Sequence, residues 1–362
     1  MVFFLANAFR YVERGVMHDG TIPYPGVLDV IQKLRQANKE LIILSNSSKR
    51  KDNSIKVLTK LGFNPLQDFT KIITSGEVSY QLLRQVSKAS TSESSATADG
   101  SDDDDIDSDL TPQPWSVLAD TVNNNVFCLG SGDDDEEYIQ SCGWKLSTID
   151  EASLIVARGT FAISDGSQTT HKKHDGENAY ETRLQESLEL AANRQLPMIV
   201  CNPDKIRPDS DRSPMPGQIG DAYERELQKL QPEDSSIEER KLVAENLVKR
   251  IGKPFSDVYE IALRGKSTTT TTVRACMIGD ALETDVTGGT LQNIDTVWVI
   301  NDGIHNVAVE ERLEKIGDES DADDSRFSKA CSGVVDEFNQ QTETYAKGRQ
   351  LRPTMIVPHF RW

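Results

Sequence analysis

The stretch VRACMIGDALETDVTGG at residues 273–289 joins an apolar run to two aspartates and a pair of glycines. The run 273–278 predicts a strand buried on both faces of a parallel sheet. Asp280 follows that strand, where a carboxylate can bind a hard cation such as Mg²⁺. We expect Asp285, about one turn later, to orient the water shell of the metal or to pair with a lysine. The alternative is that both aspartates only cap a helix.

Strand and helix patterns alternate along the rest of the chain. This alternation predicts an α/β fold, a doubly wound parallel sheet interrupted by a second, smaller α/β domain. Apolar runs predict strands at 41–44, 72–73, 126–129, 154–157, 198–201, 296–300 and 355–357. Helical spacing predicts helices at 25–37, 52–61, 77–85, 180–192 and 224–250, the last with a break near Pro232.

Composition limits the classes of partner. Lys and Arg number 40 against 58 Asp and Glu, a formal net charge of -18. A chain this acidic is a poor general binder of nucleic acid or of anionic membranes. No apolar stretch approaches the length needed to cross a bilayer. The five cysteines form no C-x-x-C pair, which favours buried thiols in a reducing, cytoplasmic compartment; organellar import remains an alternative.

Two further groups of residues could carry chemistry. Ser45 and Asn46 directly follow the run 41–44, where they can donate hydrogen bonds to a phosphoryl oxygen. Lys253 lies between Gly252 and Pro254 and could supply a positive charge beside a phosphate. Each is weak evidence alone, because serine and asparagine often cap helices and most lysines only face solvent.

Taken together and in this order, the three groups resemble motifs II, III and IV of the haloacid dehalogenase (HAD) superfamily. The long stretch between motifs II and III matches the place where subfamily II members insert a cap. The chain further resembles subfamily IIA, the p-nitrophenyl phosphatase or NagD-like branch with a C2-type cap, over nearly its whole length. The residues that carry this likeness are Gly15-Val16, Asp19-Gly20, Tyr24-Pro25-Gly26, Ser45 to Arg50, and Cys201-Asn202-Pro203-Asp204.

The resemblance implies a HAD core of Rossmann-like fold with an inserted cap. We expect a first core part at 1–86, a disordered acidic insertion at 87–119, the cap at 120–214, and a second core part at 215–362 with an acidic loop at about 317–328. It also implies a phosphatase acting on a small phosphorylated metabolite with Mg²⁺ through an aspartyl-phosphate. Asp280 and Asp285 would serve the metal, Lys253, Ser45 and Asn46 the catalysis, and Asn202 and Asp204 the substrate. A homodimer formed through the cap is expected by the same resemblance.

Motif I departs from the family. The nucleophilic aspartate should precede Gly15 by three residues, where this chain has Val12, and the acid position holds Arg14. Valine has no lone pair with which to attack phosphorus. Polar residues also interrupt the approach to Gly15, so this N-terminus fits a buried central strand poorly. Asp19 is no substitute, and we expect it in a turn before the first helix.

Three interpretations of the function follow. In the first, the N-terminal sequence comes from an incorrect first exon of an active phosphatase, which the loss of a central strand beside intact motifs II to IV favours. The chain could instead be a pseudophosphatase that binds a phosphorylated ligand or a protein partner without turnover. An interaction protein acting through the acidic insertion is the third. Activity of the chain and of Val12→Asp on p-nitrophenyl phosphate separates the first two.

Overall fold

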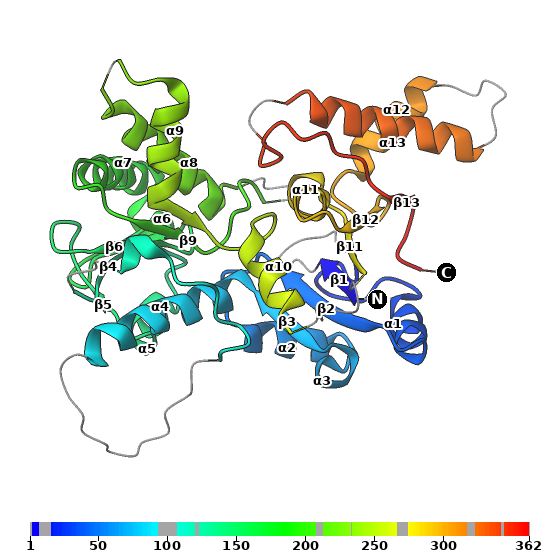
Figure 1. Cartoon of the computed structure of the whole chain (residues 1–362), viewed down its shortest axis with the longest axis horizontal. Coiled ribbons are helices and arrows are strands. Elements are labelled where there is room, and N and C mark those ends of the chain that lie inside the picture. The colour runs from blue at the N-terminus through cyan, green and yellow to red at the C-terminus, as the bar shows by residue number, and fades with distance from the viewer. Residues whose placement is uncertain are drawn as a thin grey trace.

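The computed structural model describes residues 2–6, 16–92, 107–119, 123–207, 213–232, 234–265, 274–316, 323–341 and 344–361. They form two α/β units side by side, each with its own sheet (Figure 1). We call the unit that contains both chain ends the core, and the unit formed by residues 123–250 the cap. The predicted fold class, a doubly wound parallel sheet with an inserted α/β unit, is confirmed.

Within the described residues the core sheet has six strands, and all neighbouring strands run parallel. The strand at 40–45 is apolar and buried on both faces, as a parallel sheet requires; its residues Ile42, Ile43 and Leu44 are fully buried. The order across the sheet is β13 (Met355–Val357), β12 (Asp295–Val299), β11 (Ala275–Gly279), β1 (Val2–Ala6), β2 (Glu40–Ser45) and β3 (Lys71–Thr74).

The central strand is β1, which corrects one expectation about the N-terminus. Leu5 pairs with Ile278 of β11, and Ala6 pairs with Leu44 of β2. The chain therefore has its central strand. The polar residues that were counted against a buried strand follow Ala6 in the sequence and are not part of β1.

The cap sheet has seven strands in the described part of the chain. Neighbouring strands are parallel from β10 to β4, and β7 and β8 continue the sheet antiparallel. The order is β10 (Val248–Arg250), β9 (Met198–Val200), β6 (Leu154–Ala157), β4 (Asn125–Gly130), β7 (Ala162–Ser164) and β8 (Thr169–His171), with β5 (Lys145–Leu146) beside β4.

The predicted cap boundary at residues 214 and 215 is wrong, because the cap sheet continues to Arg250. That residue pairs with Val200 of β9. Residues 248–250, expected to end a helix, form β10 instead. Helices α8 and α9 of the expected second core part pack on the cap sheet. The cap helices are α5 (Asp135–Ser141), α6 (Lys172–Asp175), α7 (Glu177–Asn193), α8 (Pro216–Lys229) and α9 (Ile237–Leu247).

The core helices are α1 (Val27–Gln36), α2 (Lys51–Lys60), α3 (Pro65–Asp68), α4 (Ser75–Ser92), α10 (Ser256–Leu263), the short η2 (Leu282–Val286), α11 (Thr287–Leu291), α12 (Asn306–Ile316) and α13 (Asp323–Asn339). The predicted helices at 25–37, 52–61 and 77–85 correspond to α1, α2 and α4, and the core also contains helices that were not predicted from the sequence. None of the helices in the described residues is long and apolar enough to cross a membrane.

Two segments expected to be irregular are partly ordered. Helix α4 runs to Ser92, and residues 107–119 bury Leu110 and Leu118 and contain the short helix η1 (Ser116–Leu118). The prediction of a disordered 87–119 is therefore wrong at both ends, and its middle, 93–106, lies outside the described residues. Likewise α13 begins at Asp323, inside the expected acidic loop.

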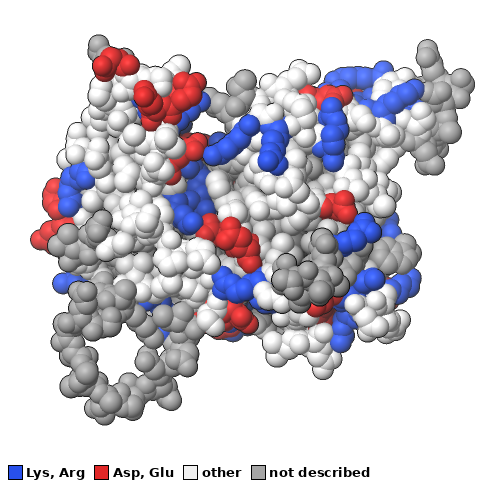
Figure 2. Space-filling view, viewed as in Figure 1, with Lys and Arg blue, Asp and Glu red and all other residues white. Residues whose placement is uncertain are grey.

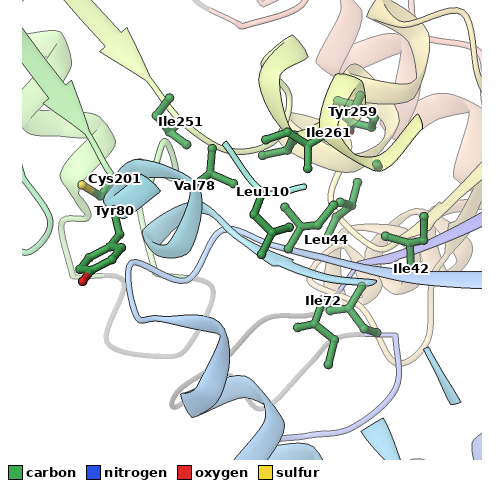
Figure 3. Packing of buried hydrophobic residues seen from close by; sticks show 14 of the residues in the cluster. Ile42, Leu44, Ile72, Val78, Tyr80, Leu110, Cys201, Ile251, Tyr259 and Ile261 are labelled. Carbon is green, nitrogen blue, oxygen red and sulfur yellow. The ribbon is translucent and has the colours of Figure 1, made fainter. Parts of the chain in front are cut away.

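One hydrophobic cluster spans the two units. It combines β2 and β3 of the core with α4, with Cys201 of the cap and with Ile251, which directly follows the cap (Figure 3). A second cluster lies between the other face of the cap sheet and α7 and α8. All five cysteines are buried and free, as predicted.

Candidate active site

The carboxyl ends of four strands meet between the core and the cap. Ser45 ends β2 and Asp280 follows β11, both in the core. Asp204 lies a few residues beyond β9, and Lys253 beyond β10, both at the edge of the cap. Gly252 shows how closely these loops approach: a Cβ there would lie 2.7 Å from Asn46 Oδ1 and 2.8 Å from Pro203 Cδ. Only glycine fits this contact, since its φ of +131° is also unfavourable for other residues.

A buried ion pair links motifs III and IV. Lys253 Nζ donates to Asp285 Oδ1 at 2.7 Å, and both side chains are nearly inaccessible to solvent. The other oxygen of Asp285, Oδ2, accepts from the backbone N–H groups of Asp280 at 3.0 Å and Ala281 at 3.1 Å. Of the two roles predicted for Asp285, the structure therefore contains the pairing with Lys253.

The Asp280 carboxylate accepts fewer hydrogen bonds than that of Asp285. Its Oδ2 accepts from the N–H of Ile304 at 3.2 Å. Burial, together with the nearby Asp285 carboxylate, raises the pKa of Asp280 to about 7 despite the lowering effect of Lys253. The Lys253 ammonium group pairs with Asp285, and among the described residues no lysine or arginine forms an ion pair with Asp280. Among the described residues no group of three or more His, Cys, Asp or Glu side chains is arranged to hold a metal ion.

Asn46 joins all three loops. Its Oδ1 accepts from the N–H of Lys253 at 2.7 Å, and its Nδ2 donates to the carbonyl of Lys253 at 2.9 Å and to Asp204 Oδ1 at 2.8 Å. Both amide hydrogens are therefore committed to protein acceptors. The predicted donation from the Asn46 side chain to a phosphoryl oxygen is not available in this arrangement. Asn46 holds the lysine and the cap aspartate in place instead.

The two cap residues predicted to bind substrate lie beside this junction. Asn202 Oδ1 accepts from the N–H of Asp204 at 2.8 Å, which stabilises the turn after β9. Burial raises the pKa of Asp204 to about 6, although its hydrogen bond from Asn46 acts in the opposite direction. The Asp204 carboxylate bonds Asn46 of the core, whereas the Asn202 side chain bonds the backbone of Asp204.

We expect Asn46→Ala to lower the free energy of unfolding by about 1–3 kcal/mol, because it leaves the buried N–H of Lys253 without an acceptor. The measurement is thermal or urea unfolding of the purified protein. Asn306→Ala is the control, since Asn306 makes an exposed bond to Glu310 and its loss should change stability by less than about 0.5 kcal/mol. Equal effects of the two variants would contradict the junction role of Asn46.

Sequence spacing did not find His305, which lies against the Asp280 loop. Its Nε2 lies 3.0 Å from Glu283 Oε2 and 3.3 Å from the N–H of Leu282, and its ring contacts that of Trp298. Burial lowers the pKa of His305, but Glu283 and the two site aspartates outweigh it and raise the pKa overall. Trp298 Nε1 donates to the carbonyl of Asp280. No motif predicts these contacts, because His305 lies on a later loop.

The remaining predicted residues have simpler placements. Ser45 is buried, and its Oγ accepts from the N–H of Ser47 at 3.2 Å. Asp19 Oδ1 accepts from the N–H groups of Thr21 and Ile22, in the turn before α1 that was predicted for it. Val12 and Arg14 lie outside the described residues, so their assignment to the motif I positions stays a prediction.

Two family models match the chain. Residues 14–145 match a model described as haloacid dehalogenase-like hydrolase, and residues 250–323 match one described as HAD-hydrolase-like. The first match begins at residue 14 and so includes neither Val12 nor the end of β1. The second contains Lys253, Asp280 and Asp285. No curated protein sequence matches the chain.

Solved structures of this family share the fold at low identity. A p-nitrophenyl phosphatase from Archaeoglobus fulgidus is 17% identical, with 99% of this chain and 96% of that chain covered and a TM-score of 0.53. A haloacid dehalogenase-like hydrolase from Brucella suis is 19% identical, with 82% and 84% covered and a TM-score of 0.51. A glycerol phosphate phosphatase from Mycobacterium tuberculosis, in complex with calcium, is 16% identical, with 99% and 73% covered and a TM-score of 0.50. At these identities the likeness concerns the fold.

Proposed function

Because the chain belongs to the haloacid dehalogenase-like hydrolases, we propose that it carries the phosphoryl site of an Mg²⁺-dependent phosphatase for a small phosphorylated compound. The observation that supports this most is the convergence of motifs II, III and IV, joined by the bonds of Asn46 and Asp285 to Lys253. Those bonds connect loops that are far apart in the sequence. A chance set of caps and surface lysines would not produce a single buried junction.

The residues fit a divalent cation next to Asp280. Burial and Asp285 raise the pKa of Asp280 to about 7, and no lysine or arginine in the described part of the chain pairs with it, so a bound cation would supply the opposite charge. When bound, Mg²⁺ neutralises charge on the phosphoryl oxygens and so favours displacement at phosphorus. Both oxygens of Asp285 already accept bonds from protein donors, so we assign it a positioning role and Asp280 the metal contact. Structures of the Mycobacterium tuberculosis glycerol phosphate phosphatase contain calcium or magnesium, in line with this proposal.

Lys253, Ser45 and Asp204 would bind and orient the phosphorylated substrate. Lys253, held by Asp285, places a fixed positive charge at the junction, where it can meet a phosphoryl oxygen. The Ser45 hydroxyl lies at the end of β2, beside the central strand, and can donate to a second oxygen. Asp204 lies at the cap side of the same junction, where the leaving group of a substrate would lie.

The attacking group is the part that this sequence does not supply, since the count back from Gly15 places Val12 at the motif I position. We therefore propose that the chain as written binds a phosphoryl group with Mg²⁺ and turns it over poorly. A pseudophosphatase with this binding function is the second candidate, favoured by the absence of a carboxylate at Val12 and at Asn7, the residue that follows β1.

The test is calorimetric titration of the protein with inorganic phosphate, with and without Mg²⁺, beside phosphate release from p-nitrophenyl phosphate. We expect Mg²⁺-dependent binding that weakens at least about tenfold in Lys253→Met, because the ammonium group that Asp285 holds at the junction is lost. Lys229→Met, an exposed lysine paired with Glu226, is the control. Folded protein that neither binds phosphate nor releases it would overturn the proposal.

A further inference from the structure

The segment after α13 crosses from the core to the cap. Leu351 is fully buried in the core, and its N–H and carbonyl both bond Asn339 of α13, at 2.7 and 3.2 Å. A few residues earlier, Lys347 pairs with Glu245 of the cap helix α9 at 3.1 Å. Residues 344–352 are therefore anchored in one unit and reach the other. We call them the C-terminal strap.

Tyr345, a residue of the C-terminal strap, contacts both loops of the candidate site. Its hydroxyl donates to the carbonyl of Pro203 at 2.8 Å, next to Asp204 in the loop after β9. Its ring meets that of Phe255 edge-on at 5.0 Å, two residues beyond Lys253. Burial raises the pKa of the Tyr345 hydroxyl, so it remains a donor at every physiological pH.

Paired charges surround the same ring. The ammonium of Lys205 lies 4.9 Å and the guanidinium of Arg250 5.9 Å from its centroid. Both cations also bond Asp221, at 2.8 and 2.9 Å, so the cluster is held from the cap side. Figure 2 shows basic and acidic side chains next to one another along the middle of this face, between the two units. Tyr345 therefore lies in a fixed polar environment, with its hydroxyl directed at Pro203.

The loop 201–204 is thus held on two sides. Asn46 bonds the Asp204 carboxylate from the core, and Tyr345 bonds the Pro203 carbonyl from the strap. Asn46 also bonds the backbone of Lys253, and Phe255 beside it packs on Tyr345. Asn46 and Tyr345 therefore each contact both loops, at different atoms and from opposite chain segments.

We propose that Tyr345 is a positioning residue, and that the C-terminal strap clamps the cap loop and the Lys253 loop in the register that the phosphoryl site needs. The clamp is a property of the fold, and only its effect on phosphate rests on the proposed function. Tyr345 touches neither Asp280 nor Lys253, so it acts through Pro203 and Phe255.

The experiment measures hydrogen exchange of backbone amides in Tyr345→Phe and Tyr345→Ala. We expect the amides of Asp204 and Lys253 to exchange about tenfold faster in Tyr345→Ala, and about threefold faster in Tyr345→Phe, which keeps the ring. Amides of β4, which β6 separates from β9 in the cap sheet, should not change. The matched control is Tyr80→Phe, because Tyr80 also bonds a cap carbonyl, that of Ser141 at 2.9 Å, away from the site.

A second measurement is the affinity for inorganic phosphate with Mg²⁺, which should weaken about tenfold in Tyr345→Ala. Unchanged exchange at Asp204 and Lys253 in both Tyr345 variants overturns the clamp, as does an equal response to Tyr80→Phe. Faster exchange with unchanged phosphate affinity overturns the positioning role. If the unmodified protein binds no phosphate while exchange responds as expected, the proposed function fails and the clamp stands. If Tyr345→Ala loses protection in β4 as well, Tyr345→Phe decides.

Discussion

An Asn7→Asp variant is expected to release phosphate from p-nitrophenyl phosphate with Mg²⁺ at least about a hundredfold faster than the unmodified chain, because it adds the missing nucleophile. The reason lies in the register of the central strand. Leu5 pairs with Ile278 and Ala6 with Leu44. In the two neighbouring strands, the next residues include Ser45 and Asp280, which carry motifs II and IV.

Asn7 is the residue that follows β1 in the sequence, whereas Val12 comes five positions later. Both lie outside the described residues. In an open α/β sheet ligands bind beyond the carboxyl ends of the strands, so we expect a residue that attacks a bound ligand to lie near such an end. Counting back from Gly15 selects Val12, and counting forward from β1 selects Asn7.

The decisive comparison is Asn7→Asp with Val12→Asp, assayed in parallel with Asn7→Ala as the control for any change at that position. Activity confined to Asn7→Asp would place the attacking residue directly after β1. Activity confined to Val12→Asp would support the count from Gly15. If both variants fold and neither is active, the phosphatase interpretation of this polypeptide is wrong and only binding remains.

Replacing Asp280 by Asn is expected to stabilise the metal-free protein at pH 8 and to abolish its response to Mg²⁺. The pKa of Asp280 is raised from 3.8 to about 7, so the folded state binds the proton more tightly than the unfolded state does. Stability from this group is therefore full below about pH 4 and is lost as the pH rises to about 7. Above that pH, the buried charge costs about 2–4 kcal/mol, which Asn avoids.

Thermal unfolding across pH measures this effect. At pH 8 without metal, Asp280→Asn should unfold about 3–6 °C higher than the unmodified protein, and the difference should vanish near pH 4. Mg²⁺ should raise the unfolding temperature of the unmodified protein only, since a ligand stabilises the state that binds it. A variant that is less stable than the parent at pH 8, or still stabilised by Mg²⁺, would contradict this account.

Asp285→Asn provides the opposite control. It removes the partner of buried Lys253, and an uncompensated buried charge typically costs about 3–5 kcal/mol. The two substitutions remove the same charge, five residues apart, and should shift stability in opposite directions. This contrast separates an unpaired functional carboxylate from a paired structural one.

The fold and the motif residues could be predicted where a local sequence pattern marks a strand and the functional residue directly follows that strand. Apolar runs mark β2 and β11, and the polar residues directly after them carry the chemistry, so Ser45 and Asp280 were found from the sequence. Strand β10 was missed because its residues, Val248–Arg250, continue a charged helical pattern and have no alternation of their own. Its pairing with β9 is decided by tertiary contacts.

The junction residues show a different limit. Asn46 was recognised, but its role was misjudged, because the number of its hydrogen bonds depends on loops more than 150 residues away. Tyr345 and His305 carry no spacing signal at all, since each acts on a loop distant in the sequence. Sequence patterns locate the ends of strands, and three-dimensional packing decides which side chains there are still free to meet a ligand.

The hydrophobic cluster that runs from β2 through α4 to Cys201 has a consequence for access to the site. Swinging the entire inserted unit away would expose apolar side chains from both sheets to water, at about 25 cal/mol for each Å² uncovered. Local motion of the short connections around Pro203 and Gly252 uncovers far less. Ligands are therefore expected to enter between the core and the cap, past the C-terminal strap. The width of the opening there limits the size of the ligand.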